Sequence, residues 1–302
     1  MIISEKVSIH RIISSSKNYF LANVATCVSV YLLVGHFAFV PFDIPVLLPS
    51  ILGTALAFFI GFNNNQAYAR WWEARKIWGS LVNDSRSWTR QVIYFSQYGK
   101  NELPTNTTIN QFIHRHIAFL YALKQNLRKS AAVEYKKHLS KNDLNYIESH
   151  SNKANALLNL QTKDINEIYL NQIIDGFQFA ELNKLIINFC DEMGKSERIS
   201  NTVFPTTYNY YTRIFVWIFI VSITAVTAQS MGVWSILDGT LIGYVFLTTH
   251  KIGQSLLNPF EEIPTGIPLN QITRTIEINL LETLGEKDIP EPIQSVKDEY
   301  IM

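Results

Sequence analysis

Four apolar runs alternate with polar stretches along the 302 residues of this chain. The runs cover residues 19–40, 48–62, 208–228 and 233–249. About 20 apolar residues in a helix cross the hydrocarbon of a bilayer, so the runs predict four transmembrane helices. The fourth is short and contains Asp238. Because no segment alternates with the period of a β-strand, we expect an all-α, multi-pass membrane protein.

The second run passes without a break into a segment rich in tryptophan and arginine. Together they predict one long helix over Leu48–Arg90. Proline occurs only at its start, at Pro49, so nothing forces the helix to stop before Gly99. The polar cluster Asn63–Gln66 marks the exit from the membrane. The helix is therefore expected to cross the bilayer and continue into water.

Thr54, Phe58 and Phe62 are spaced four residues apart in this helix and so share one stripe. Several copies of the chain around an axis would present an uncharged aromatic collar. The alternative is that these side chains pack against a neighbouring helix. Spacing alone favours that alternative, because apolar stripes on helices usually face a core.

These features divide the chain into five segments. They are an N-terminal interfacial segment (1–18), a first transmembrane hairpin with the long helix (19–98), a cytoplasmic helical region (99–205), a second hairpin (206–252) and a C-terminal cytoplasmic tail (253–302). In the first segment, Val7, Ile9, Ile12 and Ile13 can line one face of an interfacial helix. A turn at 41–45 closes the first hairpin. Residues 136–163 have few large apolar side chains and predict an exposed connection.

Lysine and arginine are distributed unevenly around the apolar runs. They precede the first and third runs and follow the second and fourth, whereas the two connecting turns contain none. Cytoplasmic loops carry the excess of these residues, so both termini and the middle region are predicted to lie in the cytoplasm, with the chain in the cell membrane. No signal-peptide pattern precedes the first run, so it is expected to remain as an anchor.

Composition and motifs exclude several classes of function. The net charge of +1, without a basic block, argues against a nucleic-acid partner. Cys27 and Cys190 are too few for a disulfide framework and are expected to be free thiols. His114 and His116 lie two residues apart on a predicted helix, which favours packing or surface roles over a shared metal. Without a phosphate-binding loop, nucleophile elbow or carboxylate dyad, we expect no enzyme, no cofactor and no metal site.

The long helix carries an unusual motif. It consists of Arg70, Trp71, Trp72, Glu73, Ala74 and Arg75, followed by Trp78, Gly79 and the run Asn83-Asp84-Ser85-Arg86. This stretch resembles the bestrophin family of membrane channels. Trp at an interface and Arg beside lipid headgroups would be the ordinary explanation, but that explanation does not predict further matches.

Further matches extend the resemblance over almost the whole chain. They are His116–Leu123 with Leu127 and Arg128, then Glu197 and Arg198 with Ile199–Thr202, Pro205, Tyr208 and Arg213, and finally Asn258, Pro259 and Phe260 with Pro268, Leu269 and Arg274–Glu282. The C-terminal part is similar to prokaryotic-type members. Val203 stands where the family usually has proline.

The resemblance implies a homopentamer in a lipid bilayer, with the long helices around a central pore and a cytoplasmic vestibule. By position, the neck collar falls on Thr54, Phe58 and Phe62, and a second constriction on Phe177. Small monovalent ions would permeate, with anions such as chloride favoured. A cation channel of the same architecture is the alternative, and a transporter or scaffold without a continuous pore is a third reading.

Charged residues near the inner constriction do not decide between anions and cations from sequence alone. Four acids would favour cations if they faced the pore, and three bases would favour anions. They are Asp175, Glu181, Asp191 and Glu192, against Arg70, Arg75 and Lys184. Calcium is not expected to open the channel, because Glu261 and Glu262 supply only two carboxylates and calcium takes about six to eight oxygen ligands.

Overall fold

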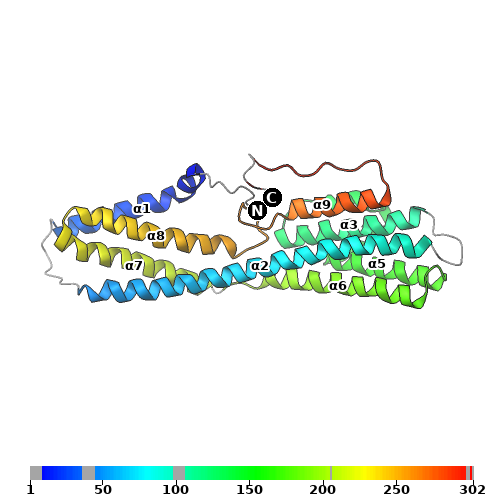
Figure 1. The fold of residues 1–302 in the computed structure, drawn as a ribbon, viewed down its shortest axis with the longest axis horizontal. Helices are drawn as coiled ribbons and strands as arrows, with labels where there is room; N and C mark the ends of the chain where they lie inside the picture. Colours follow the sequence, from blue (N-terminus) through cyan, green and yellow to red (C-terminus); the bar gives the residue numbers. More distant parts are fainter. Residues whose placement is uncertain (1–8, 36–44, 98–105, 205, 297–299, 301–302) are drawn as a thin grey trace. The chain divides into compact units, whose positions relative to one another are not determined.

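The structure is a computed structural model and describes residues 9–35, 45–97, 106–204, 206–296 and 300. Every regular element in these residues is a helix (Figure 1). The elements are α1 (Ile9–Gly35), α2 (Leu47–Gln97), α3 (Asn106–Arg128), the 3-10 helix η1 (Glu134–His138), α4 (Lys141–Glu148), α5 (Lys153–Leu170), α6 (Gly176–Asn201), α7 (Thr206–Met231), α8 (Trp234–Leu256) and α9 (Leu269–Leu284). The all-α fold class predicted from the sequence is confirmed.

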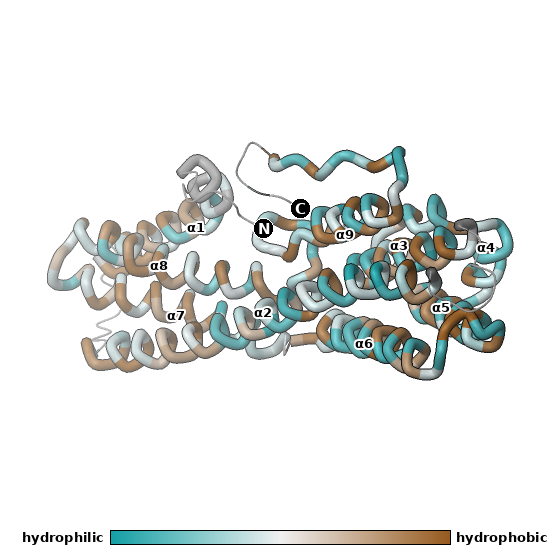
Figure 2. The backbone as a smooth tube through the Cα atoms, turned by 45° about the vertical axis from the view of Figure 1, so that its right-hand side comes forward, coloured by the Kyte–Doolittle hydropathy of each residue, from teal (hydrophilic) through white to brown (hydrophobic). Residues whose placement is uncertain are grey.

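The chain forms two compact units. We call Ser4–Trp71 with Val203–Leu257 the membrane unit, and Trp72–Thr202 with Asn258–Met302 the polar unit. The long helix α2 contributes its first half to one unit and its second half to the other, and its residues become more hydrophilic along its length (Figure 2). The single helix predicted over Leu48–Arg90 is confirmed by α2, which extends it slightly at both ends.

Four helices of the membrane unit meet in one apolar core. The core consists of Cys27 from α1, Leu56 and Ile60 from α2, Val216, Phe219 and Ile220 from α7, and Leu247 from α8. Each of these side chains is at most 5% exposed, and Leu56 and Ile60 are each 2% exposed. Both cysteines are free, Cys27 in this core and Cys190 at the surface of the polar unit.

Three helices of the described chain are long and apolar enough to cross a membrane. They lie at Ser16–Val34, Leu47–Ser96 and Thr206–Met231. The helix α8 is not among them, so the fourth span stays a prediction. The helix α1 begins at Ile9 and continues through the boundary predicted at residue 18. Val7 of the predicted interfacial face, and residues 41–44 of the turn predicted at 41–45, lie outside the described residues.

Small residues let α8 pack closely against its neighbours. Gly239 and Gly243 are four residues apart, the spacing that brings helix backbones together in membranes. A Cβ atom added to Gly243 would lie 2.6 Å from Asn23 Oδ1 and 2.8 Å from Ile220 Cγ1. Asn23 Nδ2 donates a hydrogen bond of 2.8 Å to the carbonyl of Thr240. Close approach and a buried hydrogen bond therefore hold α8 against α1 and α7.

The polar unit is built around α3, which packs against α5, α6 and α9. The exposed connection predicted for residues 136–163 is wrong. This stretch contains the end of η1, all of α4 and more than half of α5. Its apolar residues are few but correctly spaced, since Ala154, Leu157 and Leu158 are buried. Ser140 and Asn152 cap α4 and α5 by accepting hydrogen bonds from backbone N–H groups three residues on.

Buried charges reinforce the same stretch. Arg115 of α3 forms ion pairs with Asp143 of α4, at 2.6 Å, and with Asp164 of α5. All three side chains are at most 11% exposed. Breaking a buried pair leaves an uncompensated charge and costs about 3–5 kcal/mol. Composition alone therefore underestimated how firmly residues 136–163 are held.

We expect Gly243→Val to destabilise the membrane unit, because the added side chain must displace Asn23 or Ile220. Overpacking of this kind costs about 1–3 kcal/mol and should lower the melting temperature of the detergent-solubilised protein by several degrees. Gly194→Ala in α6 is the matched control, because a Cβ there meets no atom within 4 Å. Equal melting temperatures for Gly243→Val and the control would contradict this packing.

Candidate functional site

The predicted collar lies on an uncovered face of α2. Thr54, Phe58 and Phe62 are all exposed, with Phe58 at 72% and Phe62 at 52%. Leu56 and Ile60, on the other side of the helix, are buried in the core of the membrane unit. The structure thus places the three collar residues together and leaves them unpacked within one chain. Within the described residues of one chain, no helix buries these three side chains, and whether they pack against a helix of another copy stays open.

Two hydrogen bonds fix the orientation of α2 beside the collar. The hydroxyl of Tyr208 donates to the carbonyl of Phe59 at 2.9 Å, and their rings meet edge to face with centroids 6.0 Å apart. Asn64 Nδ2 donates to the carbonyl of Thr249 at 3.0 Å. Side-chain hydrogen bonds between helices in a membrane contribute about 0.6 kcal/mol each on average. They tie α2 to α7 and α8 and so oppose its rotation.

Sequence reasoning missed both of these anchors. In the sequence, Asn64 belongs to the polar cluster that predicts the membrane exit. Tyr208 belongs to one of the stretches that resemble the bestrophin family. Asn63, which precedes Asn64 in the chain, is fully buried. Neither polar atom of its side chain has a hydrogen-bond partner in the part of the chain that the structure describes. An amide inside an apolar stretch is the signal that could have indicated helix anchoring rather than exit.

The collar offers no charge and few hydrogen-bonding groups. The Thr54 hydroxyl donates to the carbonyl of Ser50 at 2.9 Å, so its proton is already used within the helix. Phe58 and Phe59 pack edge to face with centroids 6.3 Å apart. Such a surface cannot replace the hydration shell of an ion. A narrow ring of it would expel water and act as a barrier.

Phe177 lies in the first turn of α6 and is 86% exposed. Its position is fixed by a capping box, in which Asp175 accepts from the Gln178 N–H at 2.8 Å and the Gln178 side chain accepts from the Asp175 N–H at 3.0 Å. The Asp175 carboxylate is therefore engaged in holding the helix end. An exposed ring on a fixed turn is compatible with a constriction between copies, which stays a prediction.

Burial changes the charge of one predicted vestibule acid. Glu192 is 6% exposed, and burial together with the nearby Asp84 raises its pKa to about 8. At neutral pH this carboxyl group is therefore mostly protonated. Asp191 and Glu181 remain exposed on α6, where Lys195 lies 3.9 Å from Asp191. Fewer free negative charges line this helix than the sequence suggested.

Motif residues from distant parts of the chain meet in the polar unit. Glu73 and Arg198 form an ion pair of 2.6 Å, and Arg86 donates two hydrogen bonds of 3.0 and 2.7 Å to Asn279 Oδ1. Trp78, which lies between Glu73 and Arg86 on α2, is fully buried. These contacts tie α2 to α6 and α9. The motif positions in the polar unit thus hold its helices together.

The Arg128 side chain joins two further motifs. Its Nε donates to the carbonyl of Phe260 at 3.3 Å, and its Nη1 donates to Asn270 at 2.8 Å. The same guanidinium lies 3.2 Å from Glu262. Of the two carboxylates that follow Phe260, that of Glu262 therefore already has a cationic partner.

His116 has the packing role expected from its spacing. It is fully buried, with Nε2 2.9 Å from the hydroxyl of Ser85 and Nδ1 3.2 Å from Gln161. Burial lowers its pKa to about 3, so the ring is neutral at physiological pH. His114 instead stacks on His138, with centroids 5.6 Å apart. The two histidines do not share a ligand site.

The remaining motif residues have simpler positions. Trp71 stacks on Tyr68, with ring centroids 6.1 Å apart, while Trp72 is 46% exposed. Gly79 lies beside Arg75, so that an added Cβ would meet its guanidinium at an ordinary 3.5 Å. Pro205 lies outside the described residues. Among the described residues, no group of three His, Cys, Asp or Glu side chains could hold a metal ion.

Comparisons with known proteins agree with the resemblance. The profile of the bacterial and fungal bestrophin proteins matches residues 2–282. The voltage-dependent anion channel-forming protein YneE of Escherichia coli O157:H7 is 31% identical over 242 residues, which cover 80% of this chain and 77% of that protein. The Salmonella typhi protein of the same name is 30% identical over 275 residues, covering 90% and 86%.

Solved structures show the same fold. A bacterial bestrophin homologue from Klebsiella pneumoniae superimposes with a TM-score of 0.82 at 23% identity, covering 88% of this chain and 97% of that chain. A match of the family profile over nearly the full length and relatives at 30% identity together establish the relationship. The chain belongs to the bestrophin family, in its bacterial and fungal branch.

Proposed function

We propose that the chain forms a homopentameric anion channel in the cell membrane, with the uncovered face of α2 from each copy lining the pore. The observation that carries this proposal is the exposure of Phe58 and Phe62 on a helix long and apolar enough to span. One chain leaves this aromatic face unpacked, and a ring of copies would enclose it. Relatives that are named anion channel-forming proteins support the same reading.

The proposed orientation places both termini and the polar unit in the cytoplasm. Four basic residues lie toward the ends of the membrane-unit segments that connect along the chain to the polar unit or to the N-terminal segment. They are Lys17, Arg70, Arg213 and Lys251. Asp238 lies near the opposite end of α8, at the connection to α7. Positive charge concentrated at one end of the spanning helices supports a cytoplasmic location for that end.

Passage and gating would both depend on the collar. A narrow ring of phenylalanine dewets easily, so small movements of α2 could change whether water and ions occupy it. Each aromatic ring carries a positive edge and a negative face. Rings that turn their edges toward the axis would favour an anion. The mostly protonated Glu192 supports the same sign of selectivity, because it reduces the negative charge on α6.

The exposed carboxylates of Glu181 and Asp191 favour the second candidate, a monovalent cation channel of the same architecture. A transporter or membrane scaffold is the third possibility. Neither would need a continuous pore, and neither would give unitary currents. Ion selectivity and the presence of unitary currents therefore separate the three candidates.

The proposal predicts unitary anion currents from the purified pentamer. Protein that contains five chains by native mass spectrometry would be placed in a planar bilayer with a KCl gradient. The reversal potential should lie close to the chloride equilibrium potential. A reversal potential near that of potassium would establish the cation channel instead, and a stable monomer without unitary currents would contradict a channel of either kind.

Removing aromatic bulk from the collar should increase the current. Phe58→Ala or Phe62→Ala would widen and wet the proposed ring, so we expect a rise of several-fold in open probability or conductance in bilayers. Thr54→Ala should have a smaller effect, because Thr54 contributes little bulk and its proton is already donated to Ser50. Phe20→Ala, an exposed ring on α1, is the matched control. Unchanged currents for both collar variants would refute the proposed gate.

A further inference from the structure

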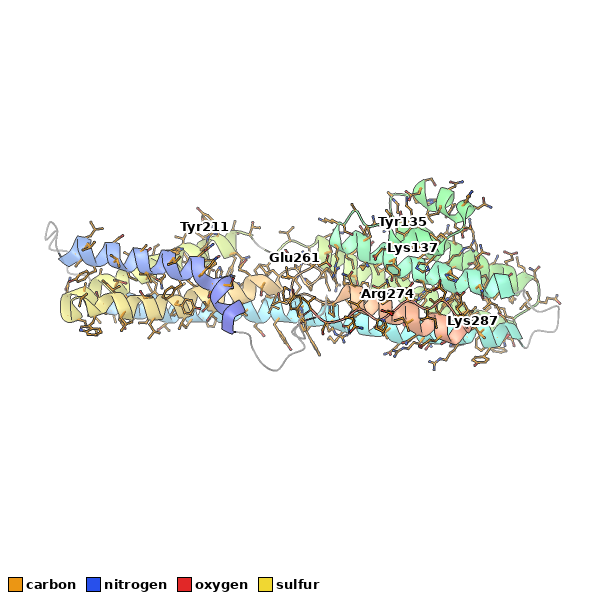
Figure 3. The ribbon with its side chains drawn as sticks, turned by 90° about the horizontal axis from the view of Figure 1, so that it is seen from above. Tyr135, Lys137, Tyr211, Glu261, Arg274 and Lys287 are labelled. Atoms are coloured by element: carbon orange, nitrogen blue, oxygen red, sulfur yellow. The ribbon has the colours of Figure 1, made fainter. Side chains whose placement is uncertain are left out.

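A cationic cavity lies within the membrane unit, away from the collar stripe. Its volume is about 620 Å³, and it opens between the first turns of α7, the last turns of α8 and Tyr19 of α1. The side chains that matter for its chemistry are Tyr19, Asn209, Arg213, His250, Lys251 and Gln254. Tyr211, labelled in Figure 3, also lines it. The volume falls within the range of about 300–1,000 Å³ that is usual for ligand sites.

The described side chains that line this cavity include two cations and no acid. Arg213 and Lys251 both line it. Among the described residues of the membrane unit, Asp238 is the only acidic one, and it lies 13 residues before Lys251 on α8. At about 1.5 Å rise per residue, this places the carboxylate roughly 20 Å away along the helix. The cavity is therefore a place where an anion would lower the electrostatic energy.

Polar atoms around the cavity also lack partners. Asn209 Oδ1, His250 Nδ1 and Gln254 Nε2 are buried and make no hydrogen bond to the residues that the structure describes. His250 is only 7% exposed. Burying a polar group without a hydrogen-bond partner is unfavourable. A ligand that reached these atoms with both donors and acceptors would recover part of that cost.

An apolar cavity adjoins the cationic one. Its volume is about 370 Å³, and Thr207 and Tyr211 line both. Phe59, Tyr208 and Phe215 complete its walls with aromatic side chains. A cationic space next to an aromatic one matches a molecule with a charged head and an apolar tail. The depth also fits, because the cavity lies at the ends of spanning helices, where lipid headgroups lie.

We propose that the cationic cavity binds the phosphate group of an anionic phospholipid, with Arg213 and Lys251 facing the phosphate and the adjoining apolar cavity taking the start of an acyl chain. Gln254 and the Tyr19 hydroxyl are placed to donate hydrogen bonds to phosphate oxygens. Asn209 Oδ1 can accept a hydrogen bond from a headgroup hydroxyl. Phosphatidylglycerol has both the charge and the hydroxyl groups, whereas phosphatidylcholine has no net charge.

Native mass spectrometry of the purified full-length protein tests this site. The protein would be incubated with equal amounts of phosphatidylglycerol and phosphatidylcholine that carry the same acyl chains. We expect phosphatidylglycerol to be retained in preference by about tenfold or more, since two basic side chains attract the anionic headgroup. The double variant Arg213→Gln/Lys251→Gln should lose this preference.

Two controls separate loss of binding from loss of folding. Lys17→Gln removes an exposed cation of α1 that does not line the cavity and should keep the wild-type preference. Arg213→Lys keeps the charge and should retain most of it. The melting temperature and the number of chains in each complex show whether a variant has folded. Equal retention of the two lipids by the wild type, or an unchanged preference in the folded double variant, would overturn the proposal.

Millimolar inorganic phosphate distinguishes the two sources of the phosphate group. Retention of phosphatidylglycerol in its presence supports a lipid as the occupant. Displacement of the lipid, together with a rise in melting temperature that the double variant lacks, supports the same phosphate site with a free ion as the occupant. Neither result depends on ion conduction, so the site can fail or stand independently of the proposed channel.

Discussion

Burial of one side of α2 is the constraint on which the rest of the membrane unit depends. Leu56 and Ile60 pack into the core formed with α1, α7 and α8, which fixes the rotation of α2 about its own axis. Rotation by half a turn would expose these side chains and bury Phe58. The core therefore determines which residues remain available to neighbouring copies. The hydrogen bonds of Tyr208 and Asn64 act on the same side and reinforce that choice.

The polar unit depends on polar contacts between its helices. Its helices are joined through several kinds of polar contact. Arg86 reaches Asn279, Arg128 reaches Phe260 and Asn270, and His116 bridges Ser85 and Gln161. The buried contacts are expected to contribute more than the half-exposed pair of Glu73 and Arg198, because exposed ion pairs are worth about 0–1 kcal/mol. Residues that identify the family thus also hold its fold.

Sequence alone predicted the elements whose signals are local and continuous. The long helix was predictable because one proline stands at its start and no breaker follows, and the collar stripe followed from a spacing of four residues. The prediction for residues 136–163 was wrong because the contacts that hold this stretch are not local in sequence. Their stability comes from Arg115, more than 20 residues earlier in the chain, and from capping by Ser140 and Asn152. Composition cannot report such long-range pairs.

The protonation and the surroundings of individual side chains could not be predicted from the sequence either. In the sequence, Glu192 is one of four acids near the predicted inner constriction. Burial beside Asp84 nevertheless keeps it mostly protonated at neutral pH. Gly239 and Gly243 were not noticed, although their spacing predicts close helix packing in a membrane. The cationic cavity depends on Arg213 and Lys251 coming together from two helices. For Glu192 and for the cavity, the deciding quantity is a distance between side chains that lie far apart in sequence.

We propose that the uncovered face of α2 lines a water-filled path between copies. Cysteine accessibility during current recording tests it most directly, in a Cys190→Ser background with the buried Cys27 left in place. Single cysteines at Thr54, Phe58 and Phe62, and for comparison at Leu56 and Ile60, would be exposed to a charged thiol reagent. The account predicts that modification changes the current at the first three positions and leaves it unchanged at the other two. A current altered only through Leu56 or Ile60 would contradict it.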